Sequence, residues 1–139
     1  MPNKLPQVTV PLEIPFYDVD AMNVAWHGNY VKYLERARCE LLRTFDYDYP
    51  QMLESGYLWP IVDMRIKYVG SVLFAQKINV TATLTEYENR LRIDYLIRCA
   101  QSGHKLTKAH TIQVAVSVDA REMQFVSPPI LLQKLGIKG

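Results

Sequence analysis

The spacing of hydrophobic and polar residues changes near residue 30 and changes back near residue 57. Apolar side chains fill every second position from Val8 to Phe16, and Pro11 and Pro15 lie on the opposite side. This period of two predicts a β-strand, and because proline cannot donate to a neighbouring strand, it predicts an edge or bulged strand. From Tyr30 onward, apolar residues recur at steps of three and four, which predicts an amphipathic helix of about 17 residues.

Alternation returns from Tyr57 and continues almost to the end of the chain. Four apolar–polar runs, separated by short polar connections, span 57–68, 78–84, 91–99 and 106–118. Connections this short are typical of hairpins, so we expect the four strands to form an antiparallel meander.

Two short helical segments are predicted outside these runs. Tyr49 precedes Pro50, so we expect Tyr49 outside the helical region, with a short helical turn over 51–56. After the last run, Ser127 is predicted to cap a short C-terminal helix with proline in its first turn.

The order of one strand, one long helix and four strands predicts an α+β fold. A five-stranded antiparallel sheet wrapped around the long helix would bury the apolar faces of both. Some strands carry apolar residues on both sides, for example Leu96 beside Tyr95, so we expect dimerisation through a sheet edge or face. The chain shows no linker or internal repeat, and we expect a single domain over residues 1–139.

Composition narrows the possible functions. The formal charge is +2, from 16 Lys and Arg against 14 Asp and Glu in scattered positions, which argues against a nucleic-acid partner. No window reaches the roughly 18 apolar residues that a membrane-spanning helix needs.

Cys39 and Cys99 lie in apolar segments and the N-terminus lacks a secretory pattern, so we expect a cytoplasmic protein. The three histidines show no metal-ligand spacing, and we expect neither a metal nor a cofactor.

Polar side chains gather between the first strand and the helix, in the stretch FYDVDAMNVAWHGNY. Asp20 and His27 are seven residues apart, so a turn could bring the Asp20 carboxylate to the first N–H groups of the helix. Those N–H groups can polarise a carbonyl, and a carboxylate beside it can attack the carbon or activate water. Gly28 permits close backbone approach, and Asn29 is a favourable N-cap.

The same residues also fit a purely structural role. Asp and Asn are common before helices because their short side chains satisfy free N–H groups and tolerate left-handed turns. Spacing alone therefore leaves two interpretations open, a capped turn and a site for acyl transfer.

The segment from Tyr17 to Arg43 resembles the signature of the hotdog-fold acyl-CoA thioesterases of the 4-hydroxybenzoyl-CoA thioesterase family, most closely its Tol-Pal-associated branch. The family pattern consists of an aromatic residue, Asp-x-Asp, a turn, an aromatic residue, His or Tyr, Asn-Tyr and a helical Glu-x-Ala-Arg. The residues of this chain that match it are Tyr17, Asp18, Asp20, Trp26, His27, Asn29, Tyr30, Glu35, Ala37 and Arg38. Asn23 replaces the usual glycine, and asparagine tolerates the positive φ that such a turn needs. The resemblance implies a hotdog fold and the hydrolysis of acyl-CoA or acyl-carrier-protein thioesters.

The resemblance also implies roles for individual residues. Asp20 is the expected catalytic carboxylate, as nucleophile or general base, and the backbone N–H of His27 is expected to polarise the thioester carbonyl. Asp18 is expected to hold the turn. The expected substrate-binding residues, several of them at an interface between subunits of a homodimer or homotetramer, are Trp26, Gly28, Asn29, Trp59 and Pro60.

Basic residues toward the sheet rim are candidates for binding the phosphates of CoA or of a pantetheine arm: Lys67, Arg90, Arg92, Lys105 and Lys108. Two alternatives to the thioesterase stay open. One is a hotdog-fold dehydratase or hydratase, although the hydratases have a shorter interval from Asp to His than Asp20 and His27 show. The other is a non-catalytic module that binds acyl thioesters. The acyl group itself is not predicted by the sequence.

Overall fold

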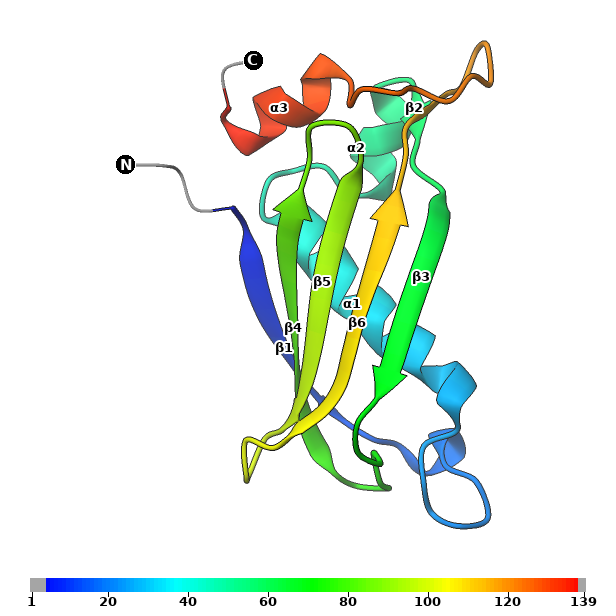
Figure 1. Cartoon of the computed structure of the whole chain (residues 1–139), viewed down its shortest axis with the longest axis vertical. Coiled ribbons are helices and arrows are strands. Elements are labelled where there is room, and N and C mark those ends of the chain that lie inside the picture. The colour runs from blue at the N-terminus through cyan, green and yellow to red at the C-terminus, as the bar shows by residue number, and fades with distance from the viewer. Residues whose placement is uncertain (1–4, 138–139) are drawn as a thin grey trace.

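A five-stranded antiparallel sheet curves along one side of helix α1 (Figure 1). This computed structural model describes residues 5–137. Its elements, in chain order, are strand β1 (Gln7–Glu13), 3-10 helices η1 (Phe16–Asp18) and η2 (His27–Asn29), helices α1 (Tyr30–Arg43) and α2 (Tyr49–Glu54), strands β2 (Tyr57–Leu58), β3 (Ile61–Tyr68), β4 (Lys77–Glu86), β5 (Leu91–Cys99), β6 (Lys105–Gln113) and β7 (Val116–Ser117), and helix α3 (Pro129–Leu135).

The strands of the main sheet lie in the order β1-β4-β5-β6-β3. β4, β5 and β6 form the expected antiparallel meander, but β3 pairs with β6 and not with β4. The prediction of a meander through all four later strands is therefore wrong for β3. The segment 69–76 crosses the end of the sheet after β3, so that β4 begins beside β1 (Figure 1). The edge position of β1, predicted from its prolines, is confirmed.

The core lies between α1 and the inner face of the sheet. Every second side chain of β4 and β5 is buried, as the alternation predicts. The helix contributes a stripe of buried side chains at three- and four-residue steps, including Tyr30, Leu34, Ala37 and Leu41. Burial of a leucine side chain contributes about 1.5–3 kcal/mol, so this stripe fixes the helix on the sheet. The predicted five-stranded sheet around one long helix is confirmed.

Two predicted strands are longer than the observed ones. The alternation up to Phe16 predicts one strand, but β1 ends at Glu13 and Phe16 begins η1 with 73% of its surface exposed. The run 106–118 is interrupted after Gln113, and its end forms β7, which pairs with β2 in a separate two-stranded ribbon. Alternation predicts an extended backbone but does not reveal where the chain leaves one sheet for another.

The helix boundaries also differ from the predictions. α1 begins at Tyr30, as predicted, but has 14 residues and not about 17, because it ends at Arg43 and Asp46 follows with a positive φ of 55°. The prediction that Tyr49 lies outside a helix is wrong: Tyr49 is the first residue of α2, and Asp48 and Gln51 form a capping box around it. Pro50 is tolerated in the first turn because no intrahelical acceptor faces its nitrogen.

The predicted cap of the C-terminal helix is wrong by one residue. Pro128 occupies the N-cap position of α3, and no side chain caps this helix. The backbone N–H of Ser127 instead donates to the carbonyl oxygen of Glu88, which ties this segment to the connection between β4 and β5. Gly136 ends α3 in the left-handed conformation, with φ of 74°.

Candidate active site

A cavity of about 350 Å³ lies at the start of the helical run that leads into α1. Six of the residues that line it are Asp20, Ala25, Trp26, His27, Tyr30 and Tyr68. The structure thus brings Asp20, Trp26 and His27 of the predicted site together.

The Asp20 side chain is exposed and holds a tight turn. Its Oδ1 atom accepts the backbone N–H of Met22 at 2.8 Å and that of Val24 at 3.4 Å. Asn23 adopts φ of 67° in this turn, so the expected positive φ at the usual glycine position is confirmed. Within residues 5–137, Oδ2 of Asp20 has no hydrogen-bond partner. One carboxylate oxygen therefore fixes the orientation of the side chain, and the other is not engaged by the described residues.

The environment of Asp18 is different. Asp18 is 3% exposed, and its carboxylate accepts hydrogen bonds from Lys32 Nζ at 2.6 Å and Tyr33 Oη at 2.8 Å. Burial and the hydrogen bond to Asp18 raise the pKa of Tyr33 far above its ordinary value, so the phenol remains a donor. Both oxygens of Asp18 are thus engaged in anchoring the loop to the first turn of α1.

His27 begins η2, which continues directly into α1. In the described part of the chain, the backbone N–H groups of His27 and Gly28 have no hydrogen-bond acceptor. Tyr68, at the end of β3, donates its hydroxyl to the carbonyl oxygen of His27 at 3.2 Å. The two free N–H groups lie at the positive end of the helical run, where an oxyanion would be stabilised.

Trp26 lies over this helix start. Its ring contacts the His27 imidazole with centroids 4.9 Å apart, and the side chain is 54% exposed. A Cβ atom at Gly28 would collide with the indole. With Trp26 in this position, the indole leaves no room for a side chain at residue 28.

The prediction that Asn29 occupies the N-cap position of α1 is confirmed, but the capping hydrogen bond expected from its side chain does not form. Asn29 already has helical φ and ψ as the last residue of η2, and its side chain makes no cap. Its amide instead donates to the carbonyl oxygen of Asp18 at 2.8 Å, and that carbonyl also accepts the N–H of Trp26 at 3.0 Å. Asn29 holds the aspartate loop against the helix start.

Trp59 and Pro60 lie elsewhere in the chain. They line a cavity of about 580 Å³ beside the second half of α1, together with Arg38, Leu42, Met52 and Gln113. Trp59 is buried and donates its indole N–H to Tyr47 Oη at 3.1 Å. α2 and β2, which flank this cavity, lie at the opposite end of the molecule from the start of α1 (Figure 1). Within one chain, the structure does not join these two residues to Asp20.

Tyr30, Tyr68 and Ser71 line the candidate cavity but were not among the predicted site residues. Tyr30 and Tyr68 pack edge to face with centroids 4.8 Å apart. Tyr30 lies in the signature and could have been inferred from it. Tyr68 reaches the site only because β3 ends beside η2, and sequence spacing gives no sign of that.

The part of the chain that the structure describes has no cluster of three or more His, Cys, Asp or Glu side chains placed to hold a metal ion. Among the described residues, no helix has both the length and the apolar composition needed to cross a bilayer.

Comparison with known proteins places the chain among thioesterases. A family model described as the thioesterase-like superfamily matches residues 14–135. The acyl-CoA thioesterase YbgC of Haemophilus influenzae is 30% identical over 120 residues, which cover 86% of each chain. The structure of a 1,4-dihydroxy-2-naphthoyl-CoA thioesterase from Synechocystis matches with a TM-score of 0.82 at 19% identity, over 94% of this chain and 96% of that one. A mutant 4-hydroxybenzoyl-CoA thioesterase bound to 4-hydroxybenzoyl-CoA matches with a TM-score of 0.79 at 16% identity, over 93% and 98% of the two chains. The predicted hotdog fold is confirmed.

Proposed function

Because this chain belongs to the thioesterase-like superfamily, we propose that it hydrolyses acyl thioesters to a free acid and a thiol at the cavity between Asp20 and His27. The observation that carries this proposal is the shared cavity: an exposed carboxylate with one free oxygen faces the same space as the start of a helical run. Thioester hydrolysis needs a group that attacks or activates water, and a group that stabilises negative charge on the carbonyl oxygen.

In the proposed mechanism, the thioester carbonyl oxygen lies at the N–H groups of His27 and Gly28. These donors are fixed before the substrate arrives, so they stabilise the developing oxyanion without reorganisation. Asp20 then either attacks the carbonyl carbon, to give a mixed anhydride that water hydrolyses, or takes a proton from the water that attacks. In both routes the bond between carbon and sulfur breaks, and the thiolate leaves and takes up a proton.

Asp18 and Asp20 have different roles in the proposed mechanism. Asp18 is buried and engaged with Lys32 and Tyr33, so it has no oxygen available for substrate. Of these two aspartates, Asp20 lines the cavity and has one oxygen without a hydrogen-bond partner among residues 5–137, which supports its assignment as the catalytic carboxylate.

We further propose that a second copy of the chain supplies Trp59 and Pro60 to the acyl-binding part of the site. Both line the other cavity, beside the far half of α1. β1 and β3 are the open edges of the sheet, and unpaired edges favour association with another copy. A homodimer or homotetramer of a single 139-residue domain, located in the cytoplasm, is the assembly that we propose. The free cysteines Cys39 and Cys99 are compatible with a reducing compartment.

A hydrolysis screen tests this function. The purified protein would be assayed against aryl, short-chain and long-chain acyl-CoAs and one acyl-carrier-protein thioester, with release of free thiol as the readout. We expect at least one thioester to be cleaved with kcat/KM above about 10⁴ M⁻¹ s⁻¹. The proposal would be contradicted if no thioester were cleaved and the protein only bound acyl thioesters. It would also be contradicted if no thioester were cleaved and the protein hydrated an enoyl-CoA.

A further inference from the structure

The hydroxyl of Tyr68 reaches the start of the helical run from the end of β3. Its Oη atom donates a hydrogen bond to the carbonyl oxygen of His27 at 3.2 Å. The same carbonyl oxygen accepts the backbone N–H of Tyr30, which closes η2. Among residues 5–137, the bond from Tyr68 is the one side-chain hydrogen bond to His27 or Gly28. A residue 41 positions further along the chain therefore holds the peptide group between His27 and Gly28.

This peptide group carries an acceptor and a donor. The carbonyl oxygen of His27 and the N–H of Gly28 belong to one planar trans peptide, so they point in opposite directions. A hydrogen bond that fixes the direction of the oxygen therefore also fixes the direction of the N–H. Donors on a carbonyl oxygen also polarise the amide, which strengthens the hydrogen bond that its N–H can make. In the proposed mechanism, this N–H is one of the two donors to the thioester carbonyl oxygen.

Few other contacts hold this peptide group in place. η2 has three residues, and Trp26 at its N-cap makes no capping hydrogen bond with its side chain. Glycine has more backbone freedom than any other residue, so the peptide before Gly28 can rotate easily. In the described part of the chain, no acceptor anchors the N–H groups of His27 and Gly28. The direction of the Gly28 N–H thus depends on the two hydrogen bonds to the His27 carbonyl oxygen.

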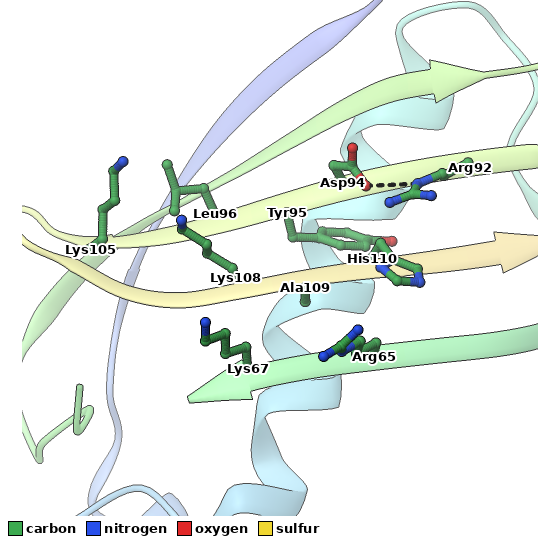
Figure 2. Close-up of a pocket in the computed structure, with 10 residues that line it drawn as sticks. All are labelled: Arg65, Lys67, Arg92, Asp94, Tyr95, Leu96, Lys105, Lys108, Ala109 and His110. Atoms are coloured by element: carbon green, nitrogen blue, oxygen red, sulfur yellow. Dashed lines mark hydrogen bonds and ion pairs between the residues drawn. The ribbon is translucent and has the colours of Figure 1, made fainter. Parts of the chain in front are cut away.

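The sheet sets the position of the Tyr68 ring. Figure 2 shows Arg65 and Lys67 on the outer face of β3, beside the other basic side chains of that face. Because the side chains of a strand alternate between its two faces, Tyr68 points to the opposite face, toward the start of α1. There its ring packs edge to face against the buried Tyr30. Pairing of Tyr68 with Thr107 of β6 fixes the end of the strand, so the hydroxyl is in place before a substrate binds.

We propose that Tyr68 is a positioning residue for thioester hydrolysis, whose hydroxyl holds the His27–Gly28 peptide so that the Gly28 N–H donates to the oxyanion. This inference rests on the proposed function and adds a residue of β3 to it. Tyr68 acts through the peptide and exchanges no proton with the substrate, because its proton is donated to the His27 carbonyl oxygen. The ring packs against Tyr30 through its carbon atoms, so the effect of the hydroxyl can be separated from the effect of packing.

Tyr68→Phe removes the hydroxyl and keeps the ring. Loss of a complete oxyanion donor lowers kcat about 10²–10³-fold, and a donor that is present but poorly aligned should cost less. We expect kcat to fall roughly three- to tenfold, with KM within about twofold of the wild-type value. The matched control is Tyr57→Phe, in β2, because Tyr57 lines neither the active-site cavity nor the cavity at Trp59. Tyr57→Phe should keep both constants.

The carbonyl stretch of a bound thioester distinguishes positioning from packing. An isotope-labelled thioester bound to the slow variant Asp20→Asn should absorb in the infrared at a lower wavenumber than the free thioester, because the N–H donors polarise its carbonyl. Adding Tyr68→Phe to this variant should make the shift smaller, and adding Tyr57→Phe should leave it unchanged. The signal comes from protein that has bound the thioester, so it reports on folded molecules.

The positioning role and the proposed function fail in different ways. If the wild type hydrolyses the thioester and Tyr68→Phe has the same kcat, the positioning role is overturned and the proposed function stands. A raised KM in Tyr68→Phe with an unchanged carbonyl shift would also overturn it, since that result indicates packing alone. If the wild type cleaves no thioester, both are overturned.

Discussion

At the scale of single residues, environment separates two aspartates that are only two positions apart. Asp18 is buried beneath the loop with both oxygens bonded, while Asp20 is exposed with one oxygen free. The same residue type thus has a structural role at one position and is available for chemistry at the other. This difference in hydrogen bonding supports the roles that the signature implies.

Asp18→Asn is expected to reduce stability. An amide cannot accept from Lys32 and Tyr33 as a carboxylate does, so a buried charge-assisted network is lost. The free energy of unfolding in urea should fall by about 1–3 kcal/mol. Asn23→Ala, in the exposed turn nearby, serves as a control for local strain and should cost less. Equal stability of Asp18→Asn and the wild type would contradict the anchoring role.

The two cysteines are expected to differ in reactivity. Hydrogen bonds from Ser102, with further donors at Gln76 and Gln101, lower the pKa of Cys99 to about 6, whereas burial raises the pKa of Cys39. The thiolate reacts with alkylating agents, so Cys99 should be largely ionised and rapidly modified by iodoacetamide at pH 7. Its labelling rate should fall as pH drops below about 6. Peptide mapping by mass spectrometry would measure both rates, and faster labelling of Cys39 would contradict this expectation.

At the scale of elements, the helix start depends on the contact between Gly28 and Trp26. Gly28→Ala forces the indole away from the backbone, because the new Cβ has no room beneath it. We expect a shift in tryptophan fluorescence and a fall in kcat/KM of about tenfold, with the far-UV circular dichroism retained. The control is Gly103→Ala, at a turn with open space but positive φ, which should lower stability without moving Trp26. Unchanged fluorescence and activity in Gly28→Ala would contradict this account.

The sequence predicts each element more reliably than it predicts the partners of the elements. Alternation predicts β4 and β5 and their buried faces because each buries the same side throughout. Strand β6 is also predicted, but the burial of its polar residue Thr111 is not. The Thr111 hydroxyl shares a hydrogen bond of 2.8 Å with Tyr95 Oη. The pairing of β3 with β6 depends on a crossover at the end of the sheet, for which local spacing gives no signal.

For the candidate site too, the sequence predicts contacts within one loop but not contacts between distant elements. Spacing and resemblance bring Asp20 and His27 together because both belong to one loop. Tyr68 joins them from 41 residues further along the chain, through sheet pairing. Trp59 and Pro60, inferred from the family pattern, lie in another cavity of the same chain, so their part in the site stays a prediction that depends on a second copy.

At the scale of the whole molecule, we expect association to be needed for activity. Light scattering coupled to size exclusion should give a mass at least twice the chain mass of 16.1 kDa. Val62 is exposed at the open β3 edge, so a charge introduced there would oppose association through this edge. Val62→Lys should weaken association and lower activity together, with the activity restored at higher protein concentration. A fully active monomer would contradict the shared site.

The most direct test of the central claim is the rate of thioester hydrolysis by Asp20→Asn. The amide can still hold the turn through its oxygen, but it can neither attack a carbonyl nor accept a proton from water. We expect kcat to fall by roughly 10²–10⁴-fold with the fold retained, while Asp119→Asn, an exposed carboxylate outside the site, keeps wild-type activity. His27→Ala should lose less, because only its backbone N–H is assigned to the carbonyl. Wild-type turnover by Asp20→Asn on the best substrate would remove this carboxylate from the mechanism.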